Sequence, residues 1–189
     1  MAALQKPKEN DVRRYTYSDY LEWDDDTRWE LIDGIPYAMA APLISHQSAS
    51  TNITVQIGQF LRGKSCKVSH SPTDVRLNAD KLDNTVVQPD LLVVCDKTKL
   101  DDGKAVNGAP DMTVEVLSPS SASHDMVRKF GLYLKAGVRE YWIVDPVTKS
   151  IIVNVLSEGT YISKAYSETD KVPISALEGC VVDLQEVFA

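Results

Sequence analysis

The fold is decided by PDMTVEVLSPSSASHDMVRKFGLYLKAGVREYWIVDP, the stretch from Pro110 to Pro146. Its first part, DMTVEVLS, is rich in β-branched residues and predicts a buried strand. A helix follows, with serines that can cap its start and Gly137 that can end it. The segment REYWIVDP then predicts a second buried strand, which Pro146 stops. The stretch therefore indicates a strand, a helix and a strand in succession.

The chain before this stretch predicts a helix, a hairpin and a second helix. TYSDYLEW is typical of a short helix with Thr16 or Ser18 as its N-cap. WELIDGIPYAMA predicts a hairpin, because its Asp33-Gly34 dipeptide suits a type I′ turn, in which both central residues need positive φ. From Ser45 to about Leu61 apolar residues recur at helical spacing, and Gly63 can end that helix.

The remaining segments are mainly of β type. CKVSHSPTDVRL and TVVQPDLLVVCD precede DMTVEVLS, and the polar loop KTKLDDGKAVNGAP separates the second run from the third. SIIVNVL and TYISKAYS predict a further hairpin across SEG, and GCVVDLQEVFA predicts a short terminal element. This order predicts an α/β (α+β) domain with a central mixed β-sheet flanked by helices. No GxGxxG or GxxxxGK[ST] motif occurs, so a doubly wound nucleotide-binding fold is disfavoured.

Composition indicates one globular domain. The 189 residues are 43% hydrophobic and 25% charged, which suffices for one substantial core. We expect residues 1–14 to form a flexible N-terminal arm and residues 15–189 to form the domain. No apolar run approaches the roughly 18 residues of a membrane span, and the N-terminus lacks the apolar segment of a signal peptide. The sequence therefore predicts a cytoplasmic protein with no membrane partner.

Charge, cysteines and histidines restrict the class of site. The net charge of −7 counts against a broad basic surface for nucleic acid, although a local patch can still be basic. Cys66, Cys95 and Cys180 are odd in number and widely separated, so they predict neither a disulfide framework nor a CxxC metal site, and Cys95 is interpreted as a small core residue. The histidines lack HExxH spacing, which disfavours a zinc site.

Two carboxylates are the best candidates for chemistry. Alternation along MTVEVL puts Glu115 on one face with Thr113 and Leu117. If that strand lies inside a sheet, an ionised Glu115 needs a metal, a cation or hydrogen bonds; the alternative is a glutamate on an exposed face. Asp90 follows Pro89 at the start of LLVV, where ligands often bind at the end of a sheet. Pro110-Asp111 repeats the dipeptide, but Asp111 lies on the same strand as Glu115, so Asp90 is the preferred partner.

The third candidate is Lys129. On a helical wheel Met126, Val127, Phe130, Tyr133 and Leu134 form an apolar arc, and Lys129 lies beside it. From the margin of the core its long side chain can bring an ammonium to carboxylates on the sheet. The alternative is a solvated ion pair between Asp125 and Lys129 at i, i+4 spacing.

The segments ELIDGIPYAM, QPDLLVVCD and the Pro110–Pro146 stretch together resemble the Uma family of restriction-endonuclease-like proteins, which is abundant in cyanobacteria. The resemblance runs from about Tyr15 to the C-terminus. It implies the fold of the PD-(D/E)xK nuclease superfamily, a mixed sheet with helices in the order α-β-β-β-α-β. It also implies that Asp90 and Glu115 are the two acids of the motif. Leu117 stands where the lysine of the superfamily normally lies, and Lys129 matches the position to which that lysine has moved in the family.

The same resemblance implies a cofactor, a reaction and partners. Asp90 and Glu115 would bind Mg²⁺ or Mn²⁺, with a backbone carbonyl from the Thr113–Leu117 strand as a further ligand. Lys129 would orient the attacking water or stabilise the transition state. Glu30 and His46 match recurrent family positions that line the cleft; for His46 the alternative is a polar residue at a helix N-terminus. Asp74 and Asp145 are interpreted as structural.

These expectations lead to two functions of different classes. The first is a Mg²⁺-dependent endonuclease that hydrolyses DNA, acting as a homodimer because cutting both strands needs two sites. The second is a catalytically weak nuclease-fold protein that binds nucleic acid or protein as a regulatory dimer. The displaced lysine, the acidic net charge and the lack of a separate DNA-recognition domain favour the second function.

Overall fold

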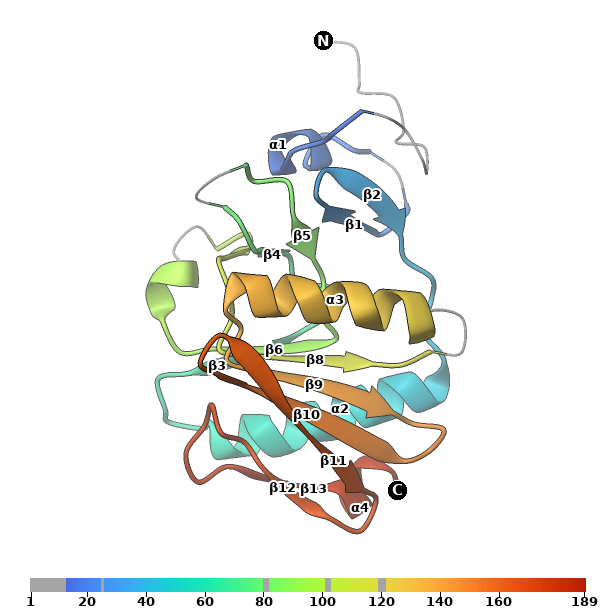
Figure 1. Ribbon diagram of the computed structural model, residues 1–189, viewed down its shortest axis with the longest axis vertical. Helices are drawn as coiled ribbons and strands as arrows, with labels where there is room; N and C mark the ends of the chain where they lie inside the picture. Colours follow the sequence, from blue (N-terminus) through green and yellow to red (C-terminus); the bar gives the residue numbers. More distant parts are fainter. Residues whose placement is uncertain (1–12, 25, 80–81, 101–102, 119–121) are drawn as a thin grey trace.

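A computed structural model of the protein describes residues 13–24, 26–79, 82–100, 103–118 and 122–189, with the backbone alone for residues 122–126. Most of the arm expected at residues 1–14 lies outside the described residues. Figure 1 labels the elements, which are α1 (Tyr17–Tyr20), β1 (Trp29–Ile32), β2 (Ile35–Ala38), α2 (Ile44–Phe60), β3 (Lys67–His70), β4 (Val75–Arg76), β5 (Val86–Val87), β6 (Leu91–Val94), η1 (Lys97–Leu100), β7 (Val106–Asn107), β8 (Met112–Val116), α3 (Ala122–Ala136), β9 (Glu140–Asp145), β10 (Ser150–Ser157), β11 (Thr160–Ser167), β12 (Lys171–Pro173), β13 (Val181–Asp183) and α4 (Leu184–Val187).

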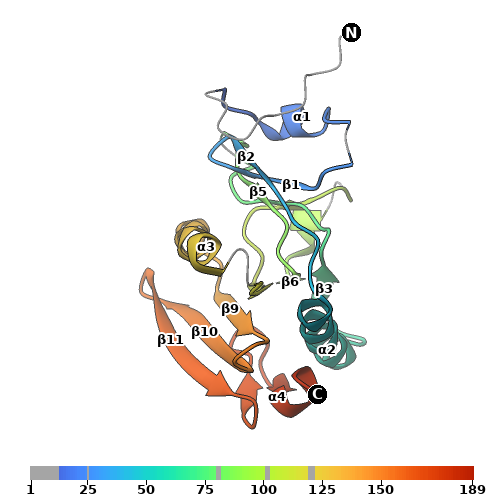
Figure 2. The same ribbon diagram turned by 90° about the vertical axis from the view of Figure 1, so that its right-hand side faces the viewer.

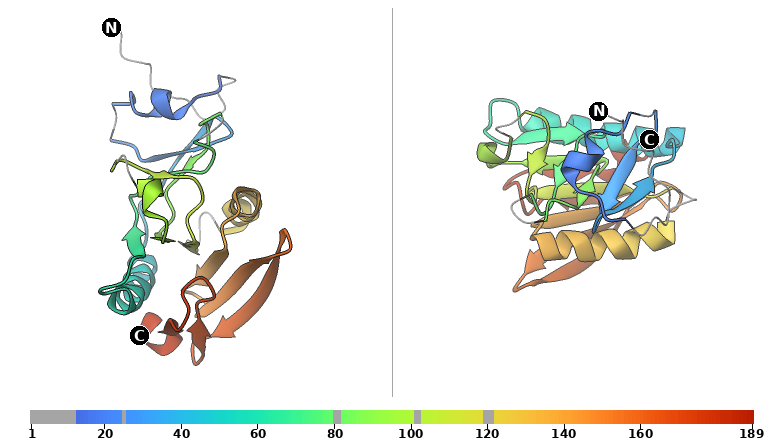
Figure 3. Two further views of the ribbon diagram at one scale, coloured as in Figure 1. Left: turned by 90° about the vertical axis from the view of Figure 1, so that its left-hand side faces the viewer. Right: turned by 90° about the horizontal axis from the view of Figure 1, so that it is seen from above.

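A mixed six-stranded sheet occupies the centre of the fold. Its strand order is β11-β10-β9-β8-β6-β3; β8 runs parallel to β9 and antiparallel to β6. The helices α2 and α3 cover its opposite faces, as Figure 2 and the view from above in Figure 3 show. The predicted mixed sheet flanked by helices is therefore confirmed, with β8, the strand that carries Glu115, in its interior.

Period-two alternation along β8 divides the core between the two faces. Met112, Val114 and Val116 pack with α2 residues and with the C-terminal segment in one apolar cluster. Leu117 and the α3 residue Tyr133 belong to a second cluster on the other face. The face predicted for Glu115 is therefore the α3 face, and the helix that follows β8 in the chain is the one that lies over Glu115.

A second sheet, of order β2-β1-β5-β4-β7, lies at the end of the molecule near α1 (Figure 1). Two segments that the sequence predicts as single β runs each divide between the two sheets. In the first, β3 joins the six-stranded sheet and β4 joins the smaller one, with Pro72 between them. In the second, β5 and β6 separate around Pro89. Since proline cannot donate to a ladder, both divisions occur where pairing must stop. Asp90 consequently lies where the chain passes from one sheet to the other.

The predicted start of α1, the β1–β2 turn and the end of α3 are confirmed, whereas residues 119–121, which include serines that can cap α3, lie outside the described residues. Thr16 caps α1 in a capping box with Asp19. The β1–β2 hairpin turns at Asp33 and Gly34, whose φ angles are 49° and 79°, as a type I′ turn requires. Gly137 follows α3 with a φ of 84°. No helix in the described parts of the chain has the length and apolar character needed to cross a membrane.

The cysteine prediction is wrong in one respect. Cys66 and Cys95 form a disulfide, with Cα atoms 3.9 Å apart, and Cys180 is free and buried. The register of β3 and β6 explains the pairing, because Lys67 lies opposite Val94 and the cysteines occupy the next pair of positions. Cys95 is half-buried and packs against the main core, but as one half of a disulfide rather than as the small core residue that was predicted. The sequence spacing gives no sign of this pair, since the strand register creates it.

Candidate active site

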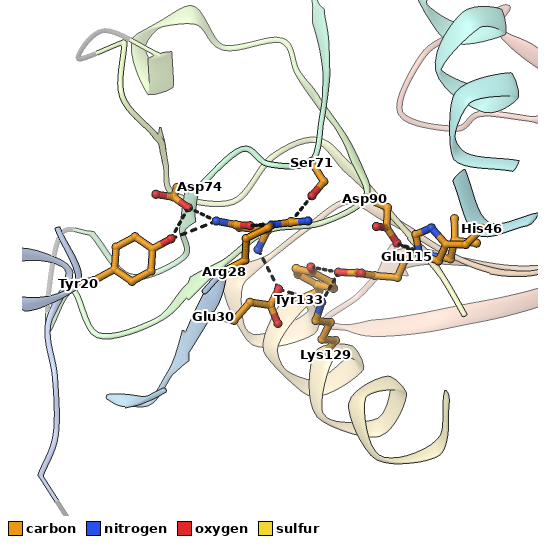
Figure 4. Close-up of polar contacts among 12 residues, drawn as sticks. Tyr20, Arg28, Glu30, His46, Ser71, Asp74, Asp90, Glu115, Lys129 and Tyr133 are labelled. Carbon is orange, nitrogen blue, oxygen red and sulfur yellow. Dashed lines mark hydrogen bonds and ion pairs between the residues drawn. The ribbon is translucent and has the colours of Figure 1, made fainter. Parts of the chain in front are cut away.

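Five residues that the sequence singles out line one pocket of about 410 Å³. Each comes from a different segment. They are Glu30 on β1, His46 on α2, Asp90 before β6, Glu115 on β8 and Lys129 on α3. Figure 4 shows their side chains directed toward one another across the junction of the two sheets. A larger pocket of about 560 Å³ lies against the C-terminal part of α3 and contains none of the five.

Lys129 joins the two glutamates. Its Nζ lies 3.0 Å from Glu115 Oε1 and 3.0 Å from Glu30 Oε1, and the residue is only 9% exposed. The predicted approach from the helix to the sheet is therefore confirmed in part: Lys129 reaches Glu115, but its second carboxylate partner is Glu30 rather than Asp90. The predicted apolar arc is wrong at Val127, which is 75% exposed. The side chain of Asp125, the alternative partner, lies outside the described residues.

Glu115 is buried, and the alternative of an exposed sheet face is wrong. Its Oε1 accepts hydrogen bonds from Lys129 Nζ and, at 2.6 Å, from the hydroxyl of Tyr133. Burial raises the pKa of Glu115 to about 7. The Lys129 charge opposes this rise in the pKa, and the nearby charges of Asp90 and Glu30 add to it. Glu115 therefore depends on its cationic and hydrogen-bonding partners to ionise.

Asp90 ties β6 to β8 and contacts His46. Its Oδ2 accepts a hydrogen bond of 2.8 Å from the backbone N–H of Val116 and lies 3.1 Å from His46 Nε2. Burial lowers the pKa of His46, but the hydrogen bond and charge of Asp90 outweigh it and raise that pKa overall. His46 Nδ1 is buried without a hydrogen-bond partner in the described part of the protein. His46 therefore lines the pocket, as the family resemblance implied. It also lies in the first turn of α2, so the alternative of a polar residue at a helix N-terminus describes its position as well.

The second Pro-Asp dipeptide is structural. Asp111 Oδ2 accepts from the backbone N–H of Cys95 at 2.7 Å, and Asp111 Oδ1 accepts from Arg139 Nη1 at 2.9 Å. Both oxygens are used within the fold, and Asp111 does not line the pocket. The choice of Asp90 over Asp111 thus agrees with the geometry.

Three further residues of the site were not predicted. Tyr133 lies one helical turn after Lys129 on α3 and donates to Glu115, so its spacing was a usable signal. Gln88 donates its backbone N–H to Glu30 Oε1 at 2.9 Å, and its side-chain Oε1 accepts from Arg28 Nη2 at 2.8 Å. These contacts join the smaller sheet to the pocket and depend on pairings that local patterns do not reveal.

Comparison with known proteins identifies the family. The family model Uma2, described as "Putative restriction endonuclease", matches residues 17–185. The chain belongs to the Uma2 family. A protein of Synechocystis named "Uncharacterized protein" is 26% identical over 163 residues, which cover 84% of each chain.

The fold of this Uma2 chain is also found in a solved structure. A protein of Anabaena variabilis, described as "a putative nuclease belonging to DUF820", matches with a TM-score of 0.75 over 92% of this chain and 97% of its own. The two sequences are 16% identical, so this likeness concerns the fold. The mixed α+β architecture is thus restriction-endonuclease-like, as the sequence resemblance implied.

The acids of this Uma2 site fit a divalent cation of the Mg²⁺ type. The second oxygens, Asp90 Oδ1 and Glu115 Oε2, make no hydrogen bond with the residues that the structure describes, and both side chains line the same pocket. No group of three or more His, Cys, Asp and Glu side chains in the described ranges is placed to hold a metal. Two carboxylates nevertheless suit Mg²⁺, which keeps several water ligands and commonly binds substrate phosphates.

Proposed function

We propose that this Uma2 protein is an endonuclease that hydrolyses DNA phosphodiester bonds with Mg²⁺ or Mn²⁺. The observation that carries the proposal is the contact of Lys129 with Glu115, because it supplies from α3 the cation that position 117 lacks. With Asp90 beside it, the pocket combines two acids and a lysine from three separate elements. Such a convergence of buried ionisable groups with perturbed pKa values is typical of functional sites.

In this proposal the chain's own residues bind and orient the reactants. A bound divalent ion would act as a Lewis acid and lower the pKa of a coordinated water. Asp90 and Glu115 would hold the ion through their unbonded carboxylate oxygens. Lys129 has three N–H donors and uses two on Glu115 and Glu30, so one remains to orient the water or contact the phosphate. Tyr133 keeps Glu115 in place by its hydrogen bond of 2.6 Å.

A second candidate function has a specific observation in its favour. Lys129 is held in two buried ion pairs, and the glutamates of these pairs neutralise its charge. The acidic net charge of −7 also opposes tight binding of DNA. The second candidate is therefore a catalytically weak nuclease-fold protein that binds nucleic acid or protein as a regulatory dimer.

A nicking assay on supercoiled plasmid tests the proposal. We expect Mg²⁺ or Mn²⁺ to support conversion to open circles, EDTA to stop it, and Asp90→Ala and Lys129→Ala to abolish it. Thr160→Ala, on the β10–β11 hairpin outside the pocket, is the matched control. Cleavage that persists in both site variants would refute the assignment of the site. A mobility shift of DNA without cleavage under any divalent ion would favour the second candidate.

The assembly and location remain separate proposals. We propose a homodimer, since two copies would present one site to each strand of a duplex. Sedimentation equilibrium measures the mass directly, and a monomer at assay concentrations that still cuts both strands would contradict it. The cytoplasmic location stays a prediction from the sequence.

A further inference from the structure

A second polar pocket continues from the active-site pocket. It has a volume of about 460 Å³ and shares Arg28, Pro42 and Asp90 with the active-site pocket. Since the same three residues border both hollows, the two form adjacent parts of one groove on either side of Asp90. A polymeric substrate whose reacting group lies near Asp90 and Glu115 can therefore extend into the second pocket.

Arg28 is the cation at this boundary. Its Nε and Nη2 both donate to Gln88 Oε1, at 3.1 and 2.8 Å, and Nη2 also donates to the hydroxyl of Ser71. Gln88 is held in turn, because its Nε2 donates to Asp74 Oδ1 at 2.9 Å and to the Tyr20 hydroxyl at 3.1 Å (Figure 4). The guanidinium is thus fixed in one orientation by a network of hydrogen bonds.

The partners of Arg28 are neutral. None of the ion pairs among the residues that the structure describes includes it, and its Nη1 donates to none of them. A partly buried guanidinium without a carboxylate partner keeps its full charge for a ligand, and its remaining donors suit a phosphate in geometry. Arg28 therefore differs from Lys129, whose charge two glutamates offset.

The helix α2 supplies the wall of the second pocket. Gln47, Ser50, Thr51 and Thr54 lie at helical spacing on one face and line it. His70, the last residue of β3, and Ser71, which follows it, also line the pocket. The side chains of Gln47 and Thr51 make no hydrogen bond with other residues in the described part of the chain, and both are exposed. Hydroxyl and amide groups of this kind commonly contact phosphates and sugars.

We propose that this second pocket binds the phosphodiester backbone next to the bond that is cleaved, with Arg28 as the phosphate-binding residue. The inference rests on the proposed nuclease function and adds the path of the substrate strand. The strand runs from the Glu115 pocket past Asp90 and along the α2 face of Gln47 and Thr51. Recognition by this path depends on backbone charge and not on base sequence.

The test measures binding and not cleavage, so that it does not depend on the chemistry. A fluorescein-labelled duplex oligonucleotide is titrated in EDTA at several NaCl concentrations, and anisotropy gives the affinity at each. Arg28→Met should weaken binding and reduce the slope of log K against log salt by about 0.9, the value for one lost phosphate contact. Thr51→Lys adds a cation on the exposed α2 face, so it should tighten binding and steepen that slope by about 0.9.

Thr160→Lys is the control for added charge, because it places the same cation on the β10–β11 hairpin outside both pockets. We expect its salt slope to match that of the wild type. If Arg28→Met binds like the wild type and Thr51→Lys binds like Thr160→Lys, the inference is overturned while plasmid cleavage by the wild type keeps the proposed function. If the wild type binds no DNA even at low salt, the inference fails, and the plasmid assay with Mg²⁺ decides the proposed function separately.

Discussion

Lys129 Nζ lies 3.0 Å from Glu115 Oε1 and equally far from Glu30 Oε1, so one ammonium links a helix and both sheets. Glu115 is central in the larger sheet, and Glu30 belongs to the smaller one. A buried ion pair of this kind adds little net stability compared with apolar residues, because desolvation offsets the attraction. Removing only one partner of the pair lowers stability strongly, however, since the remaining charges stay buried without compensation.

Lys129→Met is therefore expected to lower the free energy of unfolding by about 3–5 kcal/mol. Adding Glu115→Gln should recover part of this loss, because the double variant leaves one buried carboxylate instead of two. Urea denaturation, followed by the fluorescence of the buried Trp142, measures both. The control is Lys171→Met, which breaks a surface ion pair with Asp183 and should change the stability little. Equal stability of Lys129→Met and the wild type would contradict the ion-pair account.

The two Pro-Asp dipeptides provide a matched pair of variants. Asp90→Asn removes a charge that faces the pocket but keeps an oxygen that can accept from the backbone N–H of Val116, so we expect it to abolish metal-dependent nicking in a protein that remains folded. Asp111→Asn replaces a carboxylate that accepts from Cys95 and Arg139, so we expect lower stability with nicking retained. Plasmid nicking and thermal denaturation, run on the same preparations, compare the two effects. Loss of nicking in Asp111→Asn alone would reverse the assignment.

Local patterns were sufficient for the longer elements, such as α2, α3, β8 and β9, and for placing three of the candidate site residues. Helical periodicity placed Lys129 beside the core, strand alternation placed Glu115 on the α3 face, and Pro89 marked the start of β6. Each of these depends on a few neighbouring residues. The type I′ turn at Asp33 and Gly34 could likewise be predicted from the dipeptide alone.

Contacts set by long-range pairing could not be predicted in this way. The Glu30 contact with Lys129, the Cys66–Cys95 disulfide and the division of two β runs between sheets all depend on strand register. The prediction that Val127 is buried was wrong for a different reason, because Val127 lies at the edge of the predicted apolar arc and faces solvent. Local sequence patterns give no sign that Arg28 or Gln88 has a role. Their hydrogen bonds with Ser71 and Asp74 join residues that are distant in the sequence.

The thiols should react in a defined order. Cys180 is 2% exposed, and burial raises the pKa of its thiol, so it should not react in the folded, unreduced protein. Unfolding without reductant should expose this one free thiol, whereas unfolding with reductant should expose all three cysteines. Labelling with iodoacetamide and mass spectrometry counts them. Labelling of Cys66 or Cys95 without reductant would contradict the disulfide.

The burial of Glu140, which lies outside the pocket of Glu115 and Lys129, leads us to predict that stability depends on pH. Glu140 is fully buried; its Oε1 accepts from Trp142 Nε1 at 2.6 Å and its Oε2 from the backbone N–H of Ala176 at 2.8 Å. Burial raises the pKa of Glu140, and these hydrogen bonds only partly oppose the rise. The folded state therefore binds a proton more tightly than the unfolded state, in which the pKa is near the ordinary 4.5. This contribution to stability is fully present below pH 4.5 and is lost as the pH rises through the raised pKa.

Glu140→Gln removes this titration. We expect the unfolding free energy of the wild type, measured relative to Glu140→Gln, to fall as the pH is raised above 4.5 and to level off once Glu140 is ionised in the folded protein. Subtracting the variant cancels the contributions of all other titrating groups. Urea denaturation at a series of pH values measures the difference. Glu178→Gln, at an exposed position, is the control for the substitution itself. A difference for Glu140→Gln that is flat, or that rises with pH, would show that its hydrogen bonds outweigh its burial.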